Sequence, residues 1–227
     1  MNIAIDGPGG SGKSVLARNL AKKLGLIYVD TGALYRTVGL NAQRLGVSMN
    51  DKAGIVASLE GITVEIRYEN GDQHVFLCGE DVSGLIRTPE ISMYASAVSA
   101  VPEVRAFLDG TQRRMVERGG VVMDGRDIGT VIMPDADVKI FLFASPEHRA
   151  ERRYHELLAK GENVTYEDVL SDINKRDRAD RERDTAPAIP AEDAVMLDNS
   201  GFEPADTFAA AIRIINEKTG AGYNDIL

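Results

Sequence analysis

Glycines crowd a short loop near the start of the chain, which opens MNIAIDGPGGSGKSVLARNL. Gly7, Gly12, Lys13 and Ser14 satisfy the spacing G-x-x-x-x-G-K-S/T. In such a loop the backbone N–H groups line a concavity that suits phosphate oxygens, while the lysine reaches the β- and γ-phosphates. The serine hydroxyl is a ligand for Mg²⁺. The pattern therefore predicts a site for the triphosphate of a nucleotide.

This chemistry requires a strand before the loop and a helix after it. Residues 3–5 form a short apolar run typical of a buried strand, and apolar residues recur at helical spacing from Leu16 to Leu24, up to Gly25. Because both elements are present, a glycine-rich turn with an accidental lysine is the weaker interpretation. We expect Lys13 to be catalytic and Ser14 to hold the metal. The loop residues expected to bind the donor are Gly7, Pro8, Gly9, Gly10, Ser11, Gly12, Lys13, Ser14 and Val15.

The rest of the chain alternates short apolar runs with helical patterns. Strands are predicted at 26–29, 121–124, 138–143 and 195–198, and helices from Ser145-Pro146 to about Lys160 and from Pro204 onward. Short apolar strands separated by helices are typical of a parallel sheet covered on both faces. We therefore predict an α/β fold with a five-stranded parallel sheet and helices on both faces.

One stretch departs from this pattern. Apolar residues alternate with polar ones from Ile62 to Tyr68, Asn70-Gly71 follows, and Val75–Leu77 is again typical of a strand. This pattern predicts an antiparallel hairpin with a tight turn. We expect an inserted lobe at residues 36–100 and a core made of residues 1–35 and 101–227.

Composition narrows the class of protein. The chain has 227 residues and a formal net charge of −9, which argues against a general nucleic-acid binder. Its one cysteine, Cys78, excludes an intrachain disulfide, and no Cys/His set has zinc spacing. The apolar run 138–144 is too short to span a bilayer, and the start of the chain lacks the pattern of a signal peptide. We expect a cytoplasmic protein without a membrane partner.

A phosphate-binding loop alone does not distinguish a switch, a hydrolase and a phosphoryl donor enzyme. The guanine-reading run Asn-Lys-x-Asp of a GTPase is absent from the sequence. A donor enzyme needs a second site that holds anionic oxygens, for which the planar fork of arginine is suited. The stretches Asp30–Arg36 and Asp124–Thr130 each follow a predicted strand, so they are expected at the ligand-binding edge of the sheet.

A third arginine-bearing stretch, KRDRADRER at 175–183, has two interpretations. Its alternating charges are typical of a solvated helix face. In an acidic chain, however, an arginine cluster can also cover phosphates during transfer. The stretch at 30–36 likewise has a second interpretation, as a loop and helix start with an incidental arginine.

At this point the chain resembles the bacterial-type cytidylate kinases, over essentially its whole length and with the motifs in the same order. The motifs are IDGPGGSGKS, VDTGALYR, GEDVSGLIRT, MDGRDIGTVIMPDADVKIFL, the RR pair after Ser145 and KRDRADRER. The run DGRDIGTV with the following P-D-A-x-V-K-I-F-L is far rarer than a phosphate-binding loop. The resemblance implies transfer of the γ-phosphoryl group of ATP to CMP or dCMP, with Mg²⁺, an acceptor-binding insert at 36–100 and a short lid at about 161–187.

The resemblance also implies roles for individual residues. Thr31, where some members have serine, corresponds to a residue near the pyrimidine and its phosphate, as do Arg105, Asp127 and Arg183. Residues near the sugar correspond to Ser96, Arg176 and Asp180. The acceptor phosphate is expected at Arg36 and Arg126, and the donor phosphates at Arg152, Arg153 and Arg178. Arg126 and Arg183 are expected to act in catalysis together with Lys13.

Two functional alternatives stay open at the level of sequence. One is another small kinase with the same loop, acting on UMP, a coenzyme precursor or a sugar. The other is a nucleotide-dependent switch without an acceptor.

For a phosphate-monoester acceptor, already ionised near neutral pH, a strong general base is unnecessary, so we assign Asp127 to binding. We expect the protein to be a monomer.

Overall fold

The computed structural model describes residues 1–69 and 72–226. The chain forms two compact units, Met1–Tyr28 with Gly120–Leu227, and Val29–Gly119. The expected insert at residues 36–100 lies inside the second of these units. Among the described residues, no helix is both long enough and apolar enough to cross a membrane.

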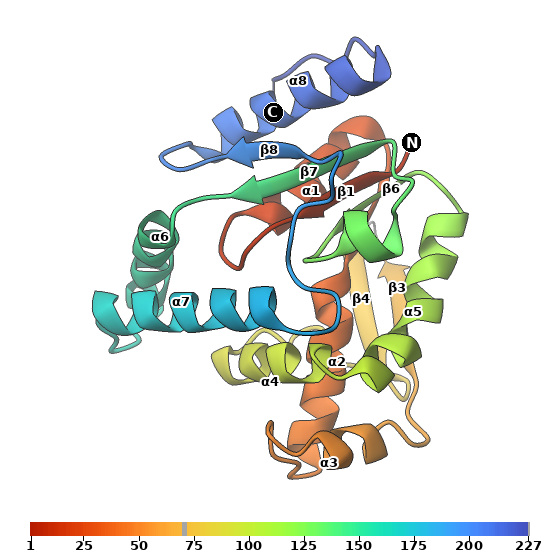
Figure 1. Cartoon of the computed structure of the whole chain (residues 1–227), viewed down its shortest axis with the longest axis vertical. Coiled ribbons are helices and arrows are strands. Elements are labelled where there is room, and N and C mark those ends of the chain that lie inside the picture. Colours follow the sequence, from red (N-terminus) through yellow and green to blue (C-terminus); the bar gives the residue numbers. More distant parts are fainter. Residues whose placement is uncertain (70–71, 227) are drawn as a thin grey trace. The chain divides into compact units, whose positions relative to one another are not determined.

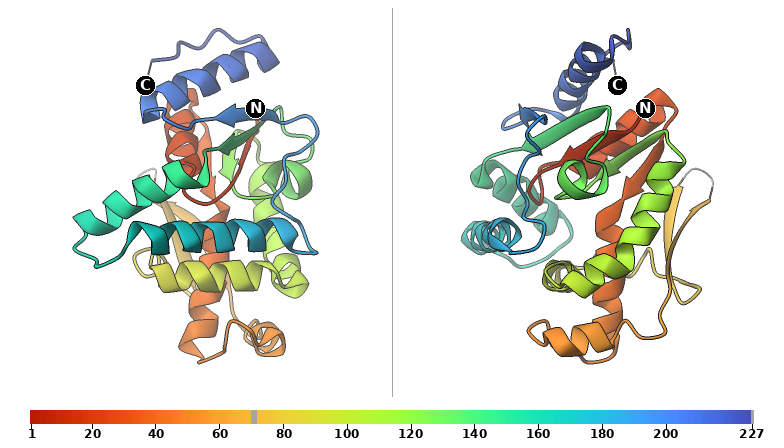
Figure 2. Two further views of the ribbon diagram at one scale, coloured as in Figure 1. Left: turned by 60° about the vertical axis from the view of Figure 1, so that its left-hand side comes forward. Right: turned by 45° about the vertical axis from the view of Figure 1, so that its right-hand side comes forward.

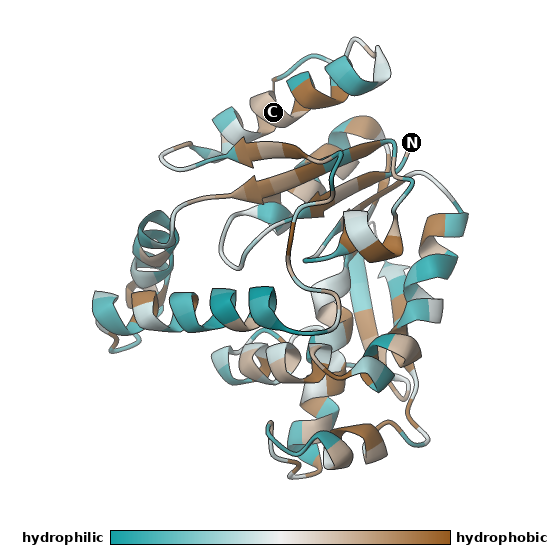
Figure 3. Ribbon diagram, viewed as in Figure 1, coloured by the Kyte–Doolittle hydropathy of each residue, from teal (hydrophilic) through white to brown (hydrophobic). Residues whose placement is uncertain are grey.

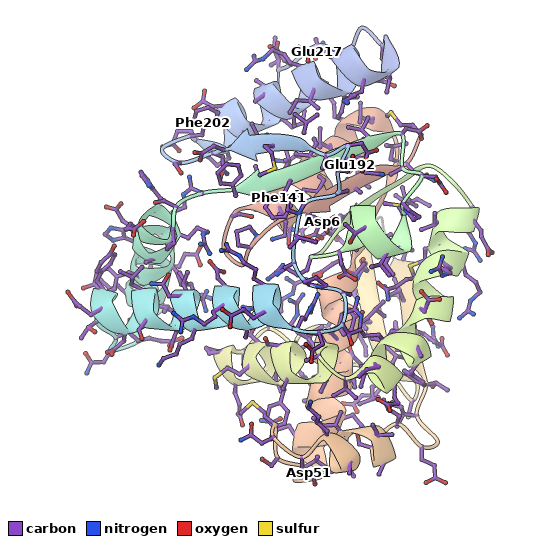
Figure 4. All side chains as sticks on the ribbon, in the orientation of Figure 1. Asp6, Asp51, Phe141, Glu192, Phe202 and Glu217 are labelled. Carbon is purple, nitrogen blue, oxygen red and sulfur yellow. The ribbon has the colours of Figure 1, made fainter. Side chains whose placement is uncertain are left out.

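The larger sheet has five parallel strands among the described residues, in the order β2-β6-β1-β7-β8. Figure 1 labels β6, β1, β7 and β8 of this sheet. These strands are β1 (Ile3–Asp6), β2 (Ile27–Asp30), β6 (Val121–Asp124), β7 (Val138–Phe143) and β8 (Val195–Asp198). The predicted parallel strands are thus confirmed. In register, Asp6 at the end of β1 lies opposite Phe141 of β7, and both are labelled in Figure 4.

Helices flank this sheet in the first unit. The apolar sides of α1 (Lys13–Leu24) and α8 (Pro204–Thr219) share a core with the strands, in which Ile5, Leu20 and Phe208 are fully buried. The predicted end of α1 at Gly25 is confirmed, since Gly25 takes a left-handed conformation with φ 67° that glycine adopts without steric cost. The helices α6 (Pro146–Ala159) and α7 (Tyr166–Glu182) pack side by side (Figure 2).

The second unit combines helices with a small sheet. The helices are α2 (Thr31–Arg44), α3 (Lys52–Ala57), α4 (Pro89–Ser99) and α5 (Pro102–Glu117). The sheet contains β3 (Val64–Glu69), β4 (Asp72–Leu77) and β5 (Glu80–Asp81), and β3 pairs antiparallel with β4. The predicted hairpin strands are therefore confirmed, while its turn at Asn70-Gly71 lies outside the described residues.

Two stretches predicted as functional lie in or next to helices. The stretch after β2 is not a loop, because α2 begins at Thr31 with Asp30 as its N-cap. Residues 175–182 belong to the last two turns of α7, and Arg183 is its C-cap. Figure 3 shows α7 as mostly hydrophilic, which agrees with the charge alternation that characterises a helix face.

Candidate functional site

The glycine-rich loop joins β1 to α1, as predicted. Gly7 has φ 145°, and a Cβ atom there would lie 1.9 Å from the carbonyl oxygen of Leu142. No other residue fits at this position, because the backbone passes so close to β7. The loop backbone is also held from β8, since Asn199 Nδ2 donates to the carbonyl oxygen of Ser11 at 2.9 Å.

Lys13 is buried at the first position of α1. Its Nζ donates to the carbonyl oxygen of Pro8 at 2.6 Å and lies 3.4 Å from Ser11 Oγ. Burial, together with the positive charge of Arg126, holds the pKa of Lys13 well below its ordinary value. A bound polyanion would offset both effects, so this lysine is suited to a phosphate group.

Ser14 contacts a carboxylate that sequence reasoning missed. Ser14 Oγ donates to Asp124 Oδ2 at 2.8 Å, and the hydroxyl of Tyr28 donates to Asp124 Oδ1 at 3.0 Å. Asp124 is buried at the carboxyl end of β6. A hydroxyl and a carboxylate are hard oxygen donors that fit a Mg²⁺ ion carried by nucleotide phosphates. The signal in the sequence was an aspartate that ends a strand beside the loop.

Arg126 and Asp180 form a largely buried ion pair. Arg126 Nε donates to Asp180 Oδ2 at 2.9 Å, which joins the segment after β6 to α7. Burial disfavours the charged form of Asp180, but the charges of Arg126 and Arg176 outweigh burial, so the pKa of Asp180 lies below its ordinary value. The structure thus brings together residues predicted for the acceptor phosphate and for the sugar.

Arg183 and Asp127 form the second such contact. Arg183 Nη2 lies 3.5 Å from Asp127 Oδ1, and both side chains are buried. Arg183 Nε also donates to the carbonyl oxygen of Ala186 at 2.6 Å. Asp127 is therefore positioned beside a guanidinium group.

Gly9 shows where these arginines lie relative to the donor loop. A Cβ atom at Gly9 would lie 3.4 Å from Arg126 Nη2 and 3.6 Å from Arg176 Nη1. Two guanidinium groups, from the segment after β6 and from α7, thus approach the backbone of the loop. Both can contact phosphates bound to it, because arginine pairs its N–H groups with phosphate oxygens.

Asp6 fixes the backbone next to Asp127. Its carboxylate accepts hydrogen bonds from the N–H groups of Ile128 at 2.8 Å and Gly129 at 2.7 Å. Burial raises the pKa of Asp6 to about 6, although these two N–H groups favour the charged form. Asp6 therefore acts on the site through the short π-helix Ile128–Ile132, whose first two N–H groups it binds.

The arginines predicted for the donor phosphates differ in their contacts. Arg152 Nη2 donates to the carbonyl oxygens of Asn199 and Phe202 at 2.9 and 3.1 Å, and Arg153 Nη1 donates to Glu156 at 3.1 Å. Arg178 is exposed on α7. Arg149, which sequence reasoning did not select, instead donates to the loop itself, at the carbonyl oxygen of Gly9.

The second unit contains the remaining predicted acceptor residues. Arg36 Nη2 donates to Asp30 Oδ2 at 2.8 Å. Arg36 Nε is buried and has no hydrogen-bond partner among the described residues. An unpaired buried N–H group is costly unless a ligand satisfies it, which fits a phosphate at this residue. Thr31, the first residue of α2, is buried one turn before Arg36.

Ser96 and Arg105 are linked within the same unit through Ser99. Arg105 Nη1 donates to the carbonyl oxygen of Ser99 at 3.2 Å, and Ser99 Oγ donates to that of Ser96 at 2.9 Å. The Arg105 guanidinium also lies 5.5 Å from the centre of the Tyr35 ring. Nothing in their local sequence pattern marks these residues, so only the family resemblance could have found them.

Comparison with known proteins places this site in context. The family model described as "Cytidylate kinase" matches residues 3–217. A cytidylate kinase of Carboxydothermus hydrogenoformans is 48% identical over 227 residues, which cover 100% of both chains. One of Pelotomaculum thermopropionicum is 50% identical over 226 residues, 99% of this chain and 98% of that one. The structure of an uncharacterized protein from Eubacterium ventriosum shares the fold, with TM-score 0.51, 12% identity, and coverage of 95% of this chain and 98% of that chain.

Proposed function

The chain belongs to the cytidylate kinase family, and on that premise we propose that it transfers the γ-phosphoryl group of ATP to CMP or dCMP. The products are ADP and CDP or dCDP. The observation that carries the proposal is the approach of Arg126 and Arg176 to the loop backbone at Gly9. A site that only bound a nucleotide would not need two further guanidinium groups at this position.

We assign the donor to the loop between β1 and α1. The backbone N–H groups from Gly9 to Ser14 hold its phosphates. Lys13 exchanges its hydrogen bond to the Pro8 carbonyl oxygen for one to the transferred phosphoryl group. Ser14 and Asp124 would hold Mg²⁺, which would neutralise charge on the phosphate oxygens of ATP. In-line transfer then depends on positioning and on charge neutralisation rather than on covalent chemistry by the protein.

We assign acceptor roles to the residues that the family resemblance selects in each unit. In the first unit, Arg126 holds the acceptor phosphate, Arg176 and Asp180 the sugar, and Asp127 with Arg183 the cytosine ring. In the second unit, the resemblance assigns Thr31, Arg36, Ser96 and Arg105 to the acceptor. The orphaned Nε of Arg36 supports its role at the acceptor phosphate. Asp127 reads the base and does not remove a proton, because the attacking phosphate oxygen is already ionised.

The donor phosphates have three further candidate arginines, Arg152, Arg153 and Arg178. Arg178 on the expected lid at 161–187 donates to no carbonyl group among the described residues, so it can approach the donor without losing such a bond. Arg152 would first have to exchange two carbonyl oxygens for phosphate oxygens.

We also propose that the enzyme works in the cytoplasm as a monomer, without nucleic acid, since its substrates are small nucleotides. Light scattering on the purified chain tests the monomer.

A coupled assay for ADP release, run with a panel of acceptors, tests the function. The panel contains CMP, dCMP, UMP, AMP, a sugar and a sample without acceptor. We expect rapid ADP formation with CMP and dCMP only. Stimulation by a different acceptor would reassign the substrate, and equal ADP formation in every sample would indicate a hydrolase or switch.

A further inference from the structure

Arg149 on α6 contacts three separate parts of the first unit. Its Nε donates to the carbonyl oxygen of Ala144 at 2.9 Å, and Nη1 donates to that of Gly9 at 2.9 Å. Nη1 and Nη2 also donate to the two carboxylate oxygens of Asp177 on α7, at 3.1 and 2.5 Å. The side chain is 2% exposed, so these bonds form away from water.

Asp177 lies between the α7 residues assigned to the acceptor. Arg176 precedes it, and Asp180 follows three residues later, on the same side of the helix. Each of the two carboxylates binds an arginine from elsewhere in the unit, Asp177 binding Arg149 and Asp180 binding Arg126. Two Arg–Asp pairs therefore attach α7 to the unit that carries the donor loop.

The two pairs differ in what their arginines can still do. Arg126 binds Asp180 through Nε, and its Nη2 faces the loop at Gly9, where a phosphate oxygen can bind. Arg149 directs all three of its guanidinium nitrogens to protein acceptors. Arg126 is thus suited to bind substrate, whereas Arg149 is suited to hold protein groups in place.

We propose that Arg149 is a positioning residue for phosphoryl transfer, which sets the distance between the donor loop and the acceptor residues of α7. One planar group binds the Gly9 carbonyl and the Asp177 carboxylate together, so the loop and α7 keep one relative placement. The geometry of an in-line transfer tolerates little error, since a misplacement of about 1 Å can lower the rate about 10²-fold. This inference rests on the proposed function.

Two variants separate the bonds of Arg149. Asp177→Asn weakens the contact with α7 and leaves the bond from Arg149 to Gly9. Arg149→Lys keeps the positive charge but loses the fork, so it cannot bind both partners at once. Arg213→Lys and Asp225→Asn are matched controls. Arg213 on α8 and Asp225, which follows α8, form an exposed ion pair with 3.4 Å between Arg213 Nη1 and Asp225 Oδ2.

The measurements are kcat, the KM for CMP and for ATP, and the thermal midpoint of each variant. For Asp177→Asn we expect kcat/KM for CMP to fall about 10-fold to 10²-fold, with the KM for ATP nearly unchanged. Arg149→Lys should in addition raise the KM for ATP, since it also loosens the loop. Because the two residues are partners, the double variant should lose no more than the more damaged single variant.

A merely structural role has a different signature. It would lower the thermal midpoint and the fraction of active enzyme, while kcat per active site and both KM values would stay at those of the wild type. That result, or losses that simply add in the double variant, would overturn the proposal. If Arg149→Lys does not fold, Asp177→Asn decides the matter by the same KM comparison. The proposed function fails separately, if the wild-type chain does not phosphorylate CMP.

Discussion

Arg126 and Asp180 are joined by a bond of 2.9 Å between Nε and Oδ2, and this bond lies beside the donor loop. The pair orients the guanidinium group so that its Nη2 faces Gly9. A phosphate acceptor bound there finds an arginine that is already in place, which saves the entropy of ordering a long side chain. Asp180 is therefore expected to affect acceptor binding through Arg126 as well as through the sugar.

Arg126→Ala and Arg36→Ala should each raise the KM for CMP strongly. Truncating one partner of a buried charged hydrogen bond costs about 2–5 kcal/mol, so an increase of about 30-fold or more is expected. The KM for ATP should change much less. Steady-state kinetics with each substrate varied in turn checks this, and a larger loss for ATP than for CMP in both variants would contradict the assignment.

Asp124→Asn should raise the Mg²⁺ concentration needed for half-maximal activity by about tenfold or more. An amide is a weaker ligand for a hard cation than a carboxylate, and it also disturbs the bond from Ser14. Tyr28→Phe should show a smaller increase, since it removes only the hydroxyl that orients Asp124. A titration of Mg²⁺ at constant ATP measures both, and unchanged curves would remove Asp124 from the metal site.

Asp6 should give the stability of the fold a measurable pH dependence. Its pKa is about 6 in the folded chain, against an ordinary value of 3.8, so the folded state binds the proton more tightly than the unfolded state. The resulting stabilisation is complete below pH 3.8 and is lost as the pH rises through 6. This loss amounts to about 3 kcal/mol.

The variant Asp6→Asn lacks this titration. The unfolding free energy of the wild type minus that of the variant should therefore fall by about 2 kcal/mol from pH 4 to pH 7, because pH 4 already lies slightly above the ordinary pKa. Because all other groups titrate alike in both proteins, their contributions cancel. Urea unfolding at several pH values checks the difference, and a constant value would show that the carboxyl group stays ionised.

Asp127 should decide between cytosine and uracil. An ionised carboxylate accepts hydrogen bonds and cannot donate, so it favours the amino group of cytosine over the carbonyl group of uracil. Asp127→Asn should therefore cut CMP activity sharply and spare the weak UMP activity. The contact with Arg183 at 3.5 Å offers the competing role of holding that arginine. If both activities fall by the same factor, Asp127 positions Arg183 and does not read the base.

Local sequence patterns were sufficient for the elements that carry the donor site. The spacing from Gly7 to Ser14, the apolar strand before it and the helix that stops at Gly25 predicted β1, the loop and α1. The β8 strand at Val195–Asp198 and the start of α8 at Pro204 were also predicted to the residue. In these segments periodicity, caps and glycine positions all agree with the fold, so sequence and structure coincide.

The attachments of α7 were not predictable from such patterns. The run 175–183 shows alternating charges, which suit a solvated helix equally well. Asp180 is nevertheless buried, and its burial could not be predicted because its partner Arg126 is 54 residues away in the chain. Arg149 was missed for the same reason, since its contacts with Gly9 and Asp177 exist only once α6 and α7 have packed. Long-range pairing of charges leaves no mark in the local sequence.

The fate of the γ-phosphate tests the central claim most directly. ATP labelled with ³²P at the γ position is incubated with CMP, Mg²⁺ and the chain, and the products are separated by thin-layer chromatography. We expect the label in the β-phosphate of CDP, in equal amount to the ADP formed. Lys13→Ala should form it about 10²- to 10³-fold more slowly. Label that appears as inorganic phosphate, or as CDP at the same rate with Lys13→Ala, would contradict transfer at this site.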